Sequence, residues 1–349
     1  MRIFVFIFVI ALTLTTISTP LVRRFAVWLG FVDTPANRKL HSAPMPLMGG
    51  LAIALGALVA FILLVSLLPV SFLTPPVFGM IGASLLIALL GLVDDRRQLP
   101  AWLKLSGQVA AASIVIFSGV QVQLHVPGWL NIAVTFVWLV GMTNAMNFMD
   151  NMDGLTAGVS CVAAAFILLL ATFNDQYLVA AVSAGIVGAT LAFLRYNFKP
   201  AQIFMGDAGS MFLGLLLAIL CLQLRFPENV NFVTWMVPVY ILGLPIFDMT
   251  LVVISRTRRG VNPLTTAGKD HLSHRLVKRG FTQREAVLLL YLVAGAFGMA
   301  GMFITSADIV EGYALGLTTV LIGLYAIWRL EMRRDRELVD QNASAVEEP

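Results

Sequence analysis

The feature that most constrains this chain is a series of apolar segments, several of which run for about 20 residues without a charged side chain. A helix of that length spans roughly 30 Å, the thickness of the hydrocarbon core of a bilayer. Only 12% of the residues are charged, against about 25% in soluble domains. So little polar surface does not cover a water-soluble particle. The sequence therefore predicts an all-α, polytopic integral membrane protein.

Turn residues between the apolar segments divide the chain into about eleven predicted transmembrane helices. The first segment has some features of a signal peptide, but the many spans after it favour its retention as a helix. Residues 1–330 then form one transmembrane domain, and residues 331–349 form a polar cytoplasmic tail. The predicted spans lie near 2–21, 47–68, 76–93, 102–119, 129–146, 156–173, 178–195, 207–224, 233–254, 285–304 and 309–329.

The basic residues are unevenly divided between the two ends of these helices. Of the 23 lysines and arginines, 21 fall on one side, and only Arg2 and Arg225 fall on the other. The positive-inside rule makes the richer side cytoplasmic, with the N-terminus outside and the C-terminus inside. Because these residues are scattered among short loops, membrane orientation explains them and nucleic-acid binding is not predicted. The cytoplasmic loops are 22–46, 93–101, 147–155, 196–206 and 255–284.

Two polar clusters on the cytoplasmic side surround the second and third spans. The first contains Lys39 and His41, followed by a glycine pair that suits close approach of backbone or ligand. Lipid headgroups account for its basic residues equally well. The second is Asp94-Asp95 at the end of the third span, with Lys104 ten residues after Asp94. Adjacent carboxylates at a membrane boundary are costly unless cations offset them, so they pair with neighbouring arginines, bind a metal or accept a proton.

The third cluster follows the fifth span and contains Asn144, Asn147, Asp150 and Asp153 before Gly154. Steps of three residues keep the last three polar side chains on one side of a helix. Oxygen-bearing side chains beside apolar sequence are expensive unless a cation or polar ligand satisfies them. We therefore expect a functional site here, with Gly154 ending the helix.

Two further clusters complete this side of the membrane. Asp207 lies between glycines at the start of the eighth span, where a carboxylate caps a helix or bridges a cation to phosphate. The loop 255–284 is rich in cations and includes His271, His274 and Arg275. Zinc would need more ligands than the chain offers, so contacts to an anionic substrate are the better interpretation. Carboxylates and Asn favour Mg²⁺ or Mn²⁺, and the whole set is typical of phosphoryl transfer.

At these residues the chain resembles the polyprenyl-phosphate N-acetylhexosamine-1-phosphate transferase family. The related phospho-MurNAc-pentapeptide translocases have three consecutive histidines where this chain has His271-Leu-Ser-His274-Arg275, which favours the undecaprenyl-phosphate N-acetylglucosamine-1-phosphate transferase subgroup. The motifs that carry the resemblance, in family order, are DTPANRKLH and PLMGG, GLVDD, NAMNFMDNMDGL, FMGDAGS, PIFD and HLSHR.

The resemblance implies that residues 1–330 are a single catalytic domain in a bacterial inner membrane, with its active site at the cytoplasmic face. Such an enzyme transfers N-acetylhexosamine 1-phosphate from a UDP-N-acetylhexosamine to undecaprenyl phosphate, releases UMP and starts a cell-envelope polysaccharide such as teichoic acid or the O-antigen of lipopolysaccharide. Its cofactor is Mg²⁺, with Mn²⁺ as an alternative. The sugar, the pathway and association into a homodimer through bilayer-facing helices stay open.

The resemblance also implies roles by position. Asn147 and Asp207 would hold the metal ion. Asp94 and Asp95 would lie beside the lipid phosphate, one of them as the base, and Lys104 would bind phosphate. The positions expected to bind substrate are Lys39, His41, Asn144, Asp150, Asp153, His271, His274 and Arg275.

Three alternatives remain at this point. A phospho-MurNAc-pentapeptide transferase would share the chemistry but use another donor. A two-step route through an aspartyl-phosphate would replace a single displacement. A membrane transporter would place its polar residues near mid-membrane, whereas here only Asp248 lies deeper than the interface.

Overall fold

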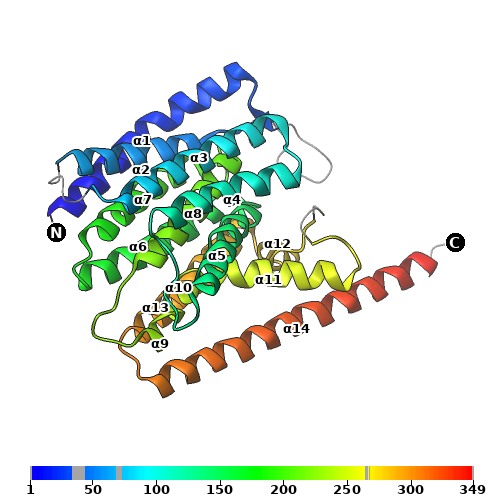
Figure 1. The fold of residues 1–349 in the computed structure, drawn as a ribbon. Helices are drawn as coiled ribbons and strands as arrows, with labels where there is room; N and C mark the ends of the chain where they lie inside the picture. The colour runs from blue at the N-terminus through cyan, green and yellow to red at the C-terminus, as the bar shows by residue number, and fades with distance from the viewer. Residues whose placement is uncertain (1, 34–43, 68–72, 264–265, 267, 348–349) are drawn as a thin grey trace.

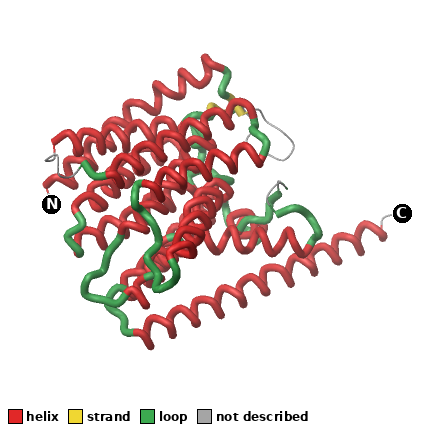
Figure 2. Tube along the Cα trace, in the orientation of Figure 1, coloured by secondary structure: helices red, strands yellow, loops and turns green. Residues whose placement is uncertain are grey.

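A computed structural model of the protein describes residues 2–33, 44–67, 73–263, 266 and 268–347, with side chains of the last helix described as far as Met332. The described residues are helical nearly throughout, and the two short strands among them pair antiparallel (Figures 1 and 2). The predicted all-α, polytopic fold is confirmed. The elements are α1 Arg2–Leu29, β1 Val32–Asp33, β2 Met45–Pro46, α2 Gly49–Leu67, α3 Pro75–Arg97, α4 Ala101–Phe117, α5 Gly128–Met149, α6 Leu155–Phe173, α7 Tyr177–Asn197, α8 Gly206–Gln223, α9 Asn231–Thr234, α10 Met236–Ile241, α11 Gly243–Arg258, α12 Leu272–Lys278, α13 Gln283–Ile304 and α14 Ile309–Glu347.

Each of the eleven predicted spans coincides with helical structure, but not all of them are helices long enough to cross a bilayer. Within the described residues, nine helices are long and apolar enough, or ten if a bent pair counts as one span. Helix α4 has only 17 residues, which at 1.5 Å per residue is about 25 Å. The expected count of eleven is therefore not reproduced by length and composition.

The predicted span 233–254 is helical, but this segment is broken into two parts. Its two parts, Asn231–Ile241 and Gly243–Arg258, meet at an angle of 71°. Pro245 has no backbone N–H to continue the hydrogen-bond ladder, and a β-carbon on Gly243 would lie 2.5 Å from the ring of Phe297 in α13. The break lets α11 turn across α13.

Helix α8 lies at the centre of the bundle. Nearly all of its residues are buried, and it packs against α2, α3, α5, α6, α7 and α10. By contrast, α14 runs along one edge of the molecule (Figure 1) and packs against α9 and α11. The first residue of the expected polar tail, Glu331, is buried within α14.

Close backbone contacts bring the ends of α2, α3 and α8 together. A β-carbon on Gly50 would lie 2.0 Å from the backbone nitrogen of Gly209, and one on Gly91 would lie 2.5 Å from Cα of Ala208. Of the two roles left open for the glycine pair of α2, the structure shows contact between helix backbones. This contact fixes where α8 begins, and Asp207 is its second residue.

Candidate active site

Four helix ends place charged and amide groups at one end of the bundle: the C-termini of α3 and α5 and the N-termini of α4 and α8. The Nζ atom of Lys104 lies 2.8 Å from Oδ2 of Asp94 and 2.5 Å from Oδ2 of Asp207. It also donates to Oδ1 of Asn147 at 3.3 Å. Three side-chain oxygens from three helices therefore surround one cation. We call these four residues the carboxylate cluster.

The amide of Asn147 is held in one orientation. Its Nδ2 donates to Oδ1 of Asp207 at 2.8 Å and to Oγ of Ser210 at 2.9 Å. Because both donors are used on α8, the amide oxygen faces Lys104. Sequence reasoning did not single out Ser210 as a partner, although it lies in the same FMGDAGS motif.

The two adjacent aspartates of α3 have different surroundings, because consecutive helical residues point about 100° apart. Asp94 contacts Lys104 and accepts a hydrogen bond from the backbone N–H of Leu99 at 2.6 Å. Asp95 instead accepts from the backbone N–H groups of Asp207 and Ala208, at 2.7 and 3.2 Å. A carboxylate at a helix N-terminus is favoured by the free N–H groups and the helix dipole. Asp95, a residue of α3, therefore caps the N-terminus of α8.

Arg96 does not serve as the partner of the aspartate pair. Its Nη1 donates to the carbonyl oxygens of Leu29 and Gly30 at 2.8 and 2.9 Å, and its guanidinium lies over the ring of Phe31. It thus satisfies the C-terminus of α1. The cation that pairs with Asp94 is Lys104.

Asn144, a predicted substrate-binding residue, contacts a second amide. Its Nδ2 donates to Oε1 of Gln108 at 2.7 Å, and Nε2 of Gln108 donates back to its Oδ1 at 3.1 Å. Gln108 is buried and was missed in the sequence. Its signal is a polar residue four positions after Lys104, on the same face of α4.

The expected helical face formed by Asn147, Asp150 and Asp153 is wrong. Helix α5 ends at Met149, and Asp150 has φ −76° and ψ 56°, outside the helical region. Gly154 has φ +79° and precedes α6, so it starts the next helix rather than ending this one. A spacing of three residues predicts a shared face only where the backbone stays helical.

The loop between α5 and α6 is fixed by the loop between α7 and α8. Asp153 accepts from the backbone N–H of Ala201 at 3.1 Å and pairs with Lys199 at 3.3 Å. The backbone N–H of Gly154 donates to Asn197 at 3.0 Å.

Asp150 lies near other carboxylates. Burial raises its pKa to about 7, and the nearby charges of Asp207, Asp95 and Asp153 act in the same direction.

The histidine segment, residues 268–279, is held by the carboxylate of Asp248. Oδ2 of Asp248 in α11 lies 2.8 Å from Nδ1 of His271, and its Oδ1 accepts from the backbone N–H of Leu272 at 2.7 Å. A carboxylate accepts only if Nδ1 carries the proton, which leaves Nε2 of a neutral ring as an acceptor. Asp248 is buried and therefore fixes both the start of α12 and the orientation of His271.

A hydrogen bond ties the histidine segment to the loop after α5. Oγ of Ser273 donates to Oδ1 of Asn151 at 2.6 Å. His274 follows on α12, and burial lowers its pKa to about 4, with the positive charge of Lys269 acting in the same direction. The imidazole of His274 is therefore neutral near pH 7. It suits hydrogen bonding to a substrate better than charge pairing with a phosphate.

Arg275, predicted to contact the donor, points to α14 instead. Its Nη2 pairs with Glu331 at 2.6 Å and donates to Oγ of Ser255 at 3.0 Å. Its Nη1 and Nε donate to the carbonyl oxygens of Leu330 and Asp270 at 3.2 and 2.8 Å. All three nitrogens of this buried guanidinium thus contact the scaffold. Two further predicted positions, Lys39 and His41, lie outside the described residues.

These features define a multi-pass membrane protein with a carboxylate, amide and ammonium site at one end of its helix bundle. The chain belongs to glycosyl transferase family 4, whose profile matches residues 77–225. That region contains all four residues of the carboxylate cluster. The predicted resemblance to the polyprenyl-phosphate N-acetylhexosamine-1-phosphate transferases, which are of this glycosyl transferase 4 type, is confirmed.

Relatives of this chain cover most of its length. A probable undecaprenyl-phosphate N-acetylglucosaminyl 1-phosphate transferase of Bacillus subtilis is 37% identical, over 86% of this chain and 85% of the relative. A decaprenyl-phosphate N-acetylglucosaminephosphotransferase of Mycolicibacterium smegmatis is 36% identical, over 83% and 80%. An undecaprenyl-phosphate alpha-N-acetylglucosaminyl 1-phosphate transferase of Escherichia coli K12 is 26% identical, over 82% and 80%.

Proposed function

We propose that this protein transfers N-acetylglucosamine 1-phosphate from UDP-N-acetylglucosamine to undecaprenyl phosphate and releases UMP. The observation that carries the proposal is the ammonium of Lys104 among oxygens of Asp94, Asn147 and Asp207. A site that gathers a cation and hard oxygen ligands can neutralise phosphate charge, which supplies most of the catalysis in phosphoryl transfer. The names of the relatives support the sugar and the polyprenyl acceptor.

The same oxygens fit Mg²⁺ as cofactor. Carboxylate and amide oxygens are the ligands that hard cations prefer. Among the described residues, no group of three His, Cys, Asp or Glu side chains could hold a metal ion by itself. Mg²⁺ commonly uses one or two carboxylates, with substrate phosphates completing its shell. Asn147 and Asp207 would therefore hold the ion, and when bound it would neutralise the charge of the donor pyrophosphate.

The chain's own residues would perform the remaining tasks. Asp94 or Asp95 accepts a proton from the lipid phosphate, whose oxygen then attacks the β-phosphorus of the donor while the bond to UMP breaks. Lys104, freed from its carboxylates, contacts a phosphate. His271, oriented by Asp248, presents Nε2 to the donor as a hydrogen-bond acceptor. The proposed location is the cytoplasmic face of a bacterial inner membrane, as the distribution of basic residues predicts.

The test uses purified protein, undecaprenyl phosphate, Mg²⁺ and UDP-N-acetylglucosamine labelled in the β-phosphate. We expect the label in the lipid fraction together with released UMP. Release of UDP with transfer of sugar alone would make the protein an ordinary glycosyltransferase. A lack of reaction with UDP-N-acetylglucosamine, UDP-N-acetylgalactosamine and UDP-MurNAc-pentapeptide would overturn the proposal and reopen the transporter interpretation.

A pair of variants separates the site from general effects on the protein. Lys104→Gln removes the central cation and should abolish transfer. Asp175→Asn is the matched control, because Asp175 is exposed in the loop between α6 and α7, at the opposite end of the bundle. Its φ of 53° is a conformation that Asn also tolerates. Equal loss in both variants would remove the support that the carboxylate cluster gives.

A further inference from the structure

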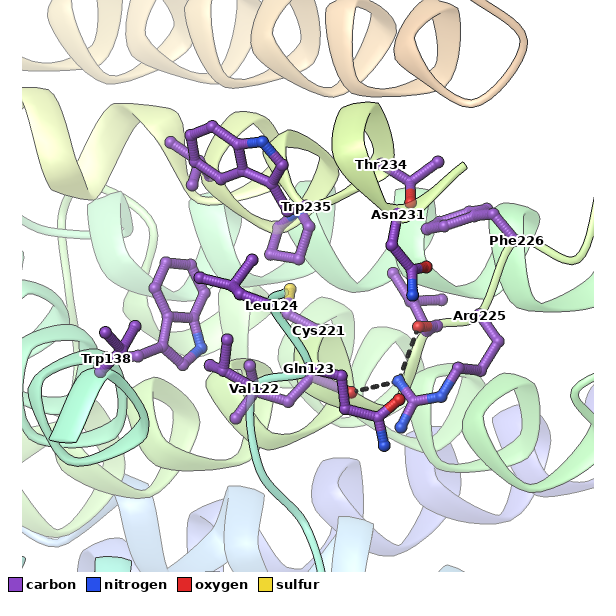
Figure 3. Close-up of a pocket in the computed structure, with 15 residues that line it drawn as sticks. Val122, Gln123, Leu124, Trp138, Cys221, Arg225, Phe226, Asn231, Thr234 and Trp235 are labelled. Carbon is purple, nitrogen blue, oxygen red and sulfur yellow. Dashed lines mark hydrogen bonds between the residues drawn. The ribbon is translucent and has the colours of Figure 1, made fainter. Parts of the chain in front are cut away.

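A second site lies at the other end of the bundle, away from the carboxylate cluster. A pocket of about 220 Å³ opens between the first half of α5, the end of α8 and helix α10 (Figure 3). Its walls are largely apolar and include Val134 and Trp138 of α5, Cys221 of α8 and Val239 of α10. None of these residues takes part in the proposed reaction.

Polar side chains gather at one side of this pocket. Figure 3 shows Arg225, Gln123 and Asn231 together on that side, with Trp138 and Trp235 on the other. Nη1 of Arg225 donates to the carbonyl oxygens of Leu222 and Leu224, at 2.7 and 3.0 Å. In the part of the chain that the structure describes, no carboxylate forms an ion pair with this guanidinium.

The backbone that carries Arg225 is firmly held. Its N–H donates to Oε1 of Gln176 at 3.0 Å, and its carbonyl oxygen accepts from Nε2 of the same side chain at 2.6 Å. The contacts of the backbone and of Nη1 together hold the guanidinium at the pocket mouth. Its Nε and Nη2 donors are available to a ligand. By the positive-inside rule this side of the membrane disfavours basic residues, and Arg225 is one of only two there. Such a residue calls for a specific anionic partner.

The pocket extends from the membrane interface into the apolar layer. Arg225 follows the end of α8 by two residues, whereas Trp138 lies ten residues inside α5, which begins at Gly128. At 1.5 Å per residue that depth is roughly 15 Å. The pocket is open, and most of its wall is apolar and offers no hydrogen-bond partner to water. A hydrocarbon chain fits it better.

We propose that this pocket binds one anionic phospholipid, with its phosphate on Arg225 and Gln123 and an acyl chain between Trp138 and Trp235. Arg is the side chain best suited to phosphate, because its planar fork offers several donors at once. Tryptophans at such a position offer an apolar body to the chain at the level of the interface. The pocket thus combines a cation for the headgroup with an apolar slot for the acyl chain.

The test measures retained lipid directly and does not rely on the proposed reaction. Purified protein is titrated with phosphatidylglycerol or phosphatidylcholine in detergent, and bound lipids are counted by native mass spectrometry. We expect one phosphatidylglycerol to bind at least about tenfold more tightly than phosphatidylcholine. Arg225→Gln should remove that preference, and Val134→Trp, which fills the slot, should weaken both lipids. The matched control is Arg2→Gln, which removes the other basic residue of this side and should leave the preference intact.

Several results would overturn the proposal. They include unchanged phosphatidylglycerol binding in Arg225→Gln, equal binding of the two lipids to the wild type, or equal losses in Arg225→Gln and Arg2→Gln. If undecaprenyl phosphate displaces phosphatidylglycerol with the same affinity that it shows in the transfer reaction, the pocket would be assigned to the acceptor lipid instead. Protein–protein crosslinks from Trp235→Cys, in complexes without lipid, would assign it to a second copy of the chain. A retained melting temperature in each variant shows that the fold is intact.

Discussion

The carboxylate cluster and the histidine segment both present polar groups to one end of the bundle, but they are held in opposite ways. In the cluster, Lys104 and the acidic groups contact one another across α3, α4 and α8. In the histidine segment, His271 and Arg275 each contact a carboxylate of a neighbouring helix, Asp248 or Glu331. Groups that neutralise one another can exchange partners when a substrate arrives, whereas groups held by the scaffold keep their position. Substitutions should therefore affect chemistry in the cluster and geometry or stability in the histidine segment.

The largest effect is expected for Asp207→Asn. Asn keeps the shape of Asp but has only one acceptor oxygen, so it can accept from Asn147 or from Lys104 but not from both. The site also loses a negative charge that would hold the cation, and the melting temperature is measured alongside to show that the fold is retained. We expect the rate of UMP release to fall on the order of 10³-fold, as for loss of a main electrostatic group. Transfer within tenfold of the wild type would show that the cluster is not the centre of the reaction.

Arg275→Gln tests the histidine segment, the other region of this comparison. It leaves the carboxylate of Glu331 buried with one partner fewer, and breaking a buried ion pair in this way costs about 3 kcal/mol of the free energy of unfolding. We expect a lower melting temperature, an unchanged KM for the donor in the protein that remains folded, and a similar loss in Glu331→Gln. A raised KM at unchanged melting temperature would instead restore Arg275 to the donor site.

Asp248→Asn tests whether the orientation of His271 affects activity. For histidines that bind a metal ion, loss of the orienting carboxylate typically costs 10- to 100-fold in activity. We expect a fall in kcat of about that size here and a changed pH profile. The control is Asn151→Ala, which breaks the hydrogen bond between Ser273 and the loop after α5 without touching His271. If both variants lose activity equally and show the same pH profile, the role of Asp248 is only to hold α12 in place.

The sequence motifs contain the members of the carboxylate cluster but not the contacts between them. Asp94, Asn147 and Asp207 stand in motifs that the topology brings together, and such oxygen-bearing residues are recognisable in apolar surroundings. The capping of α8 by Asp95 was not predictable, because it depends on which helices are neighbours. Local spacing describes one helix and contains no information on the helix beside it.

The misplaced expectations share this origin. The spacing of Asn147, Asp150 and Asp153 is helical, but the backbone leaves the helix after Met149 to meet the loop before α8. Arg275 of the cationic loop was expected to contact the donor, yet its guanidinium pairs with a glutamate more than fifty residues later in the chain. Composition identifies a basic loop, and only tertiary contacts decide which of its residues the site receives.

The smallest effect is expected from pH, through His274. Its pKa in the folded protein is lowered from the usual 6.5 to about 4, chiefly by burial. As the pH falls from about 6.5 to 4, the unfolded chain takes up a proton that the folded protein does not, so stability declines in that window. Above pH 6.5 the imidazole is neutral in both states and contributes no slope. His274→Gln should therefore flatten the fall of the melting temperature between pH 6.5 and 4, whereas Asp207→Asn should retain the contribution of His274 to it. ¹⁵N-histidine NMR provides an independent check, because a His274 ring that gains its proton near pH 6.5 would contradict its burial and leave it a cation for donor phosphate.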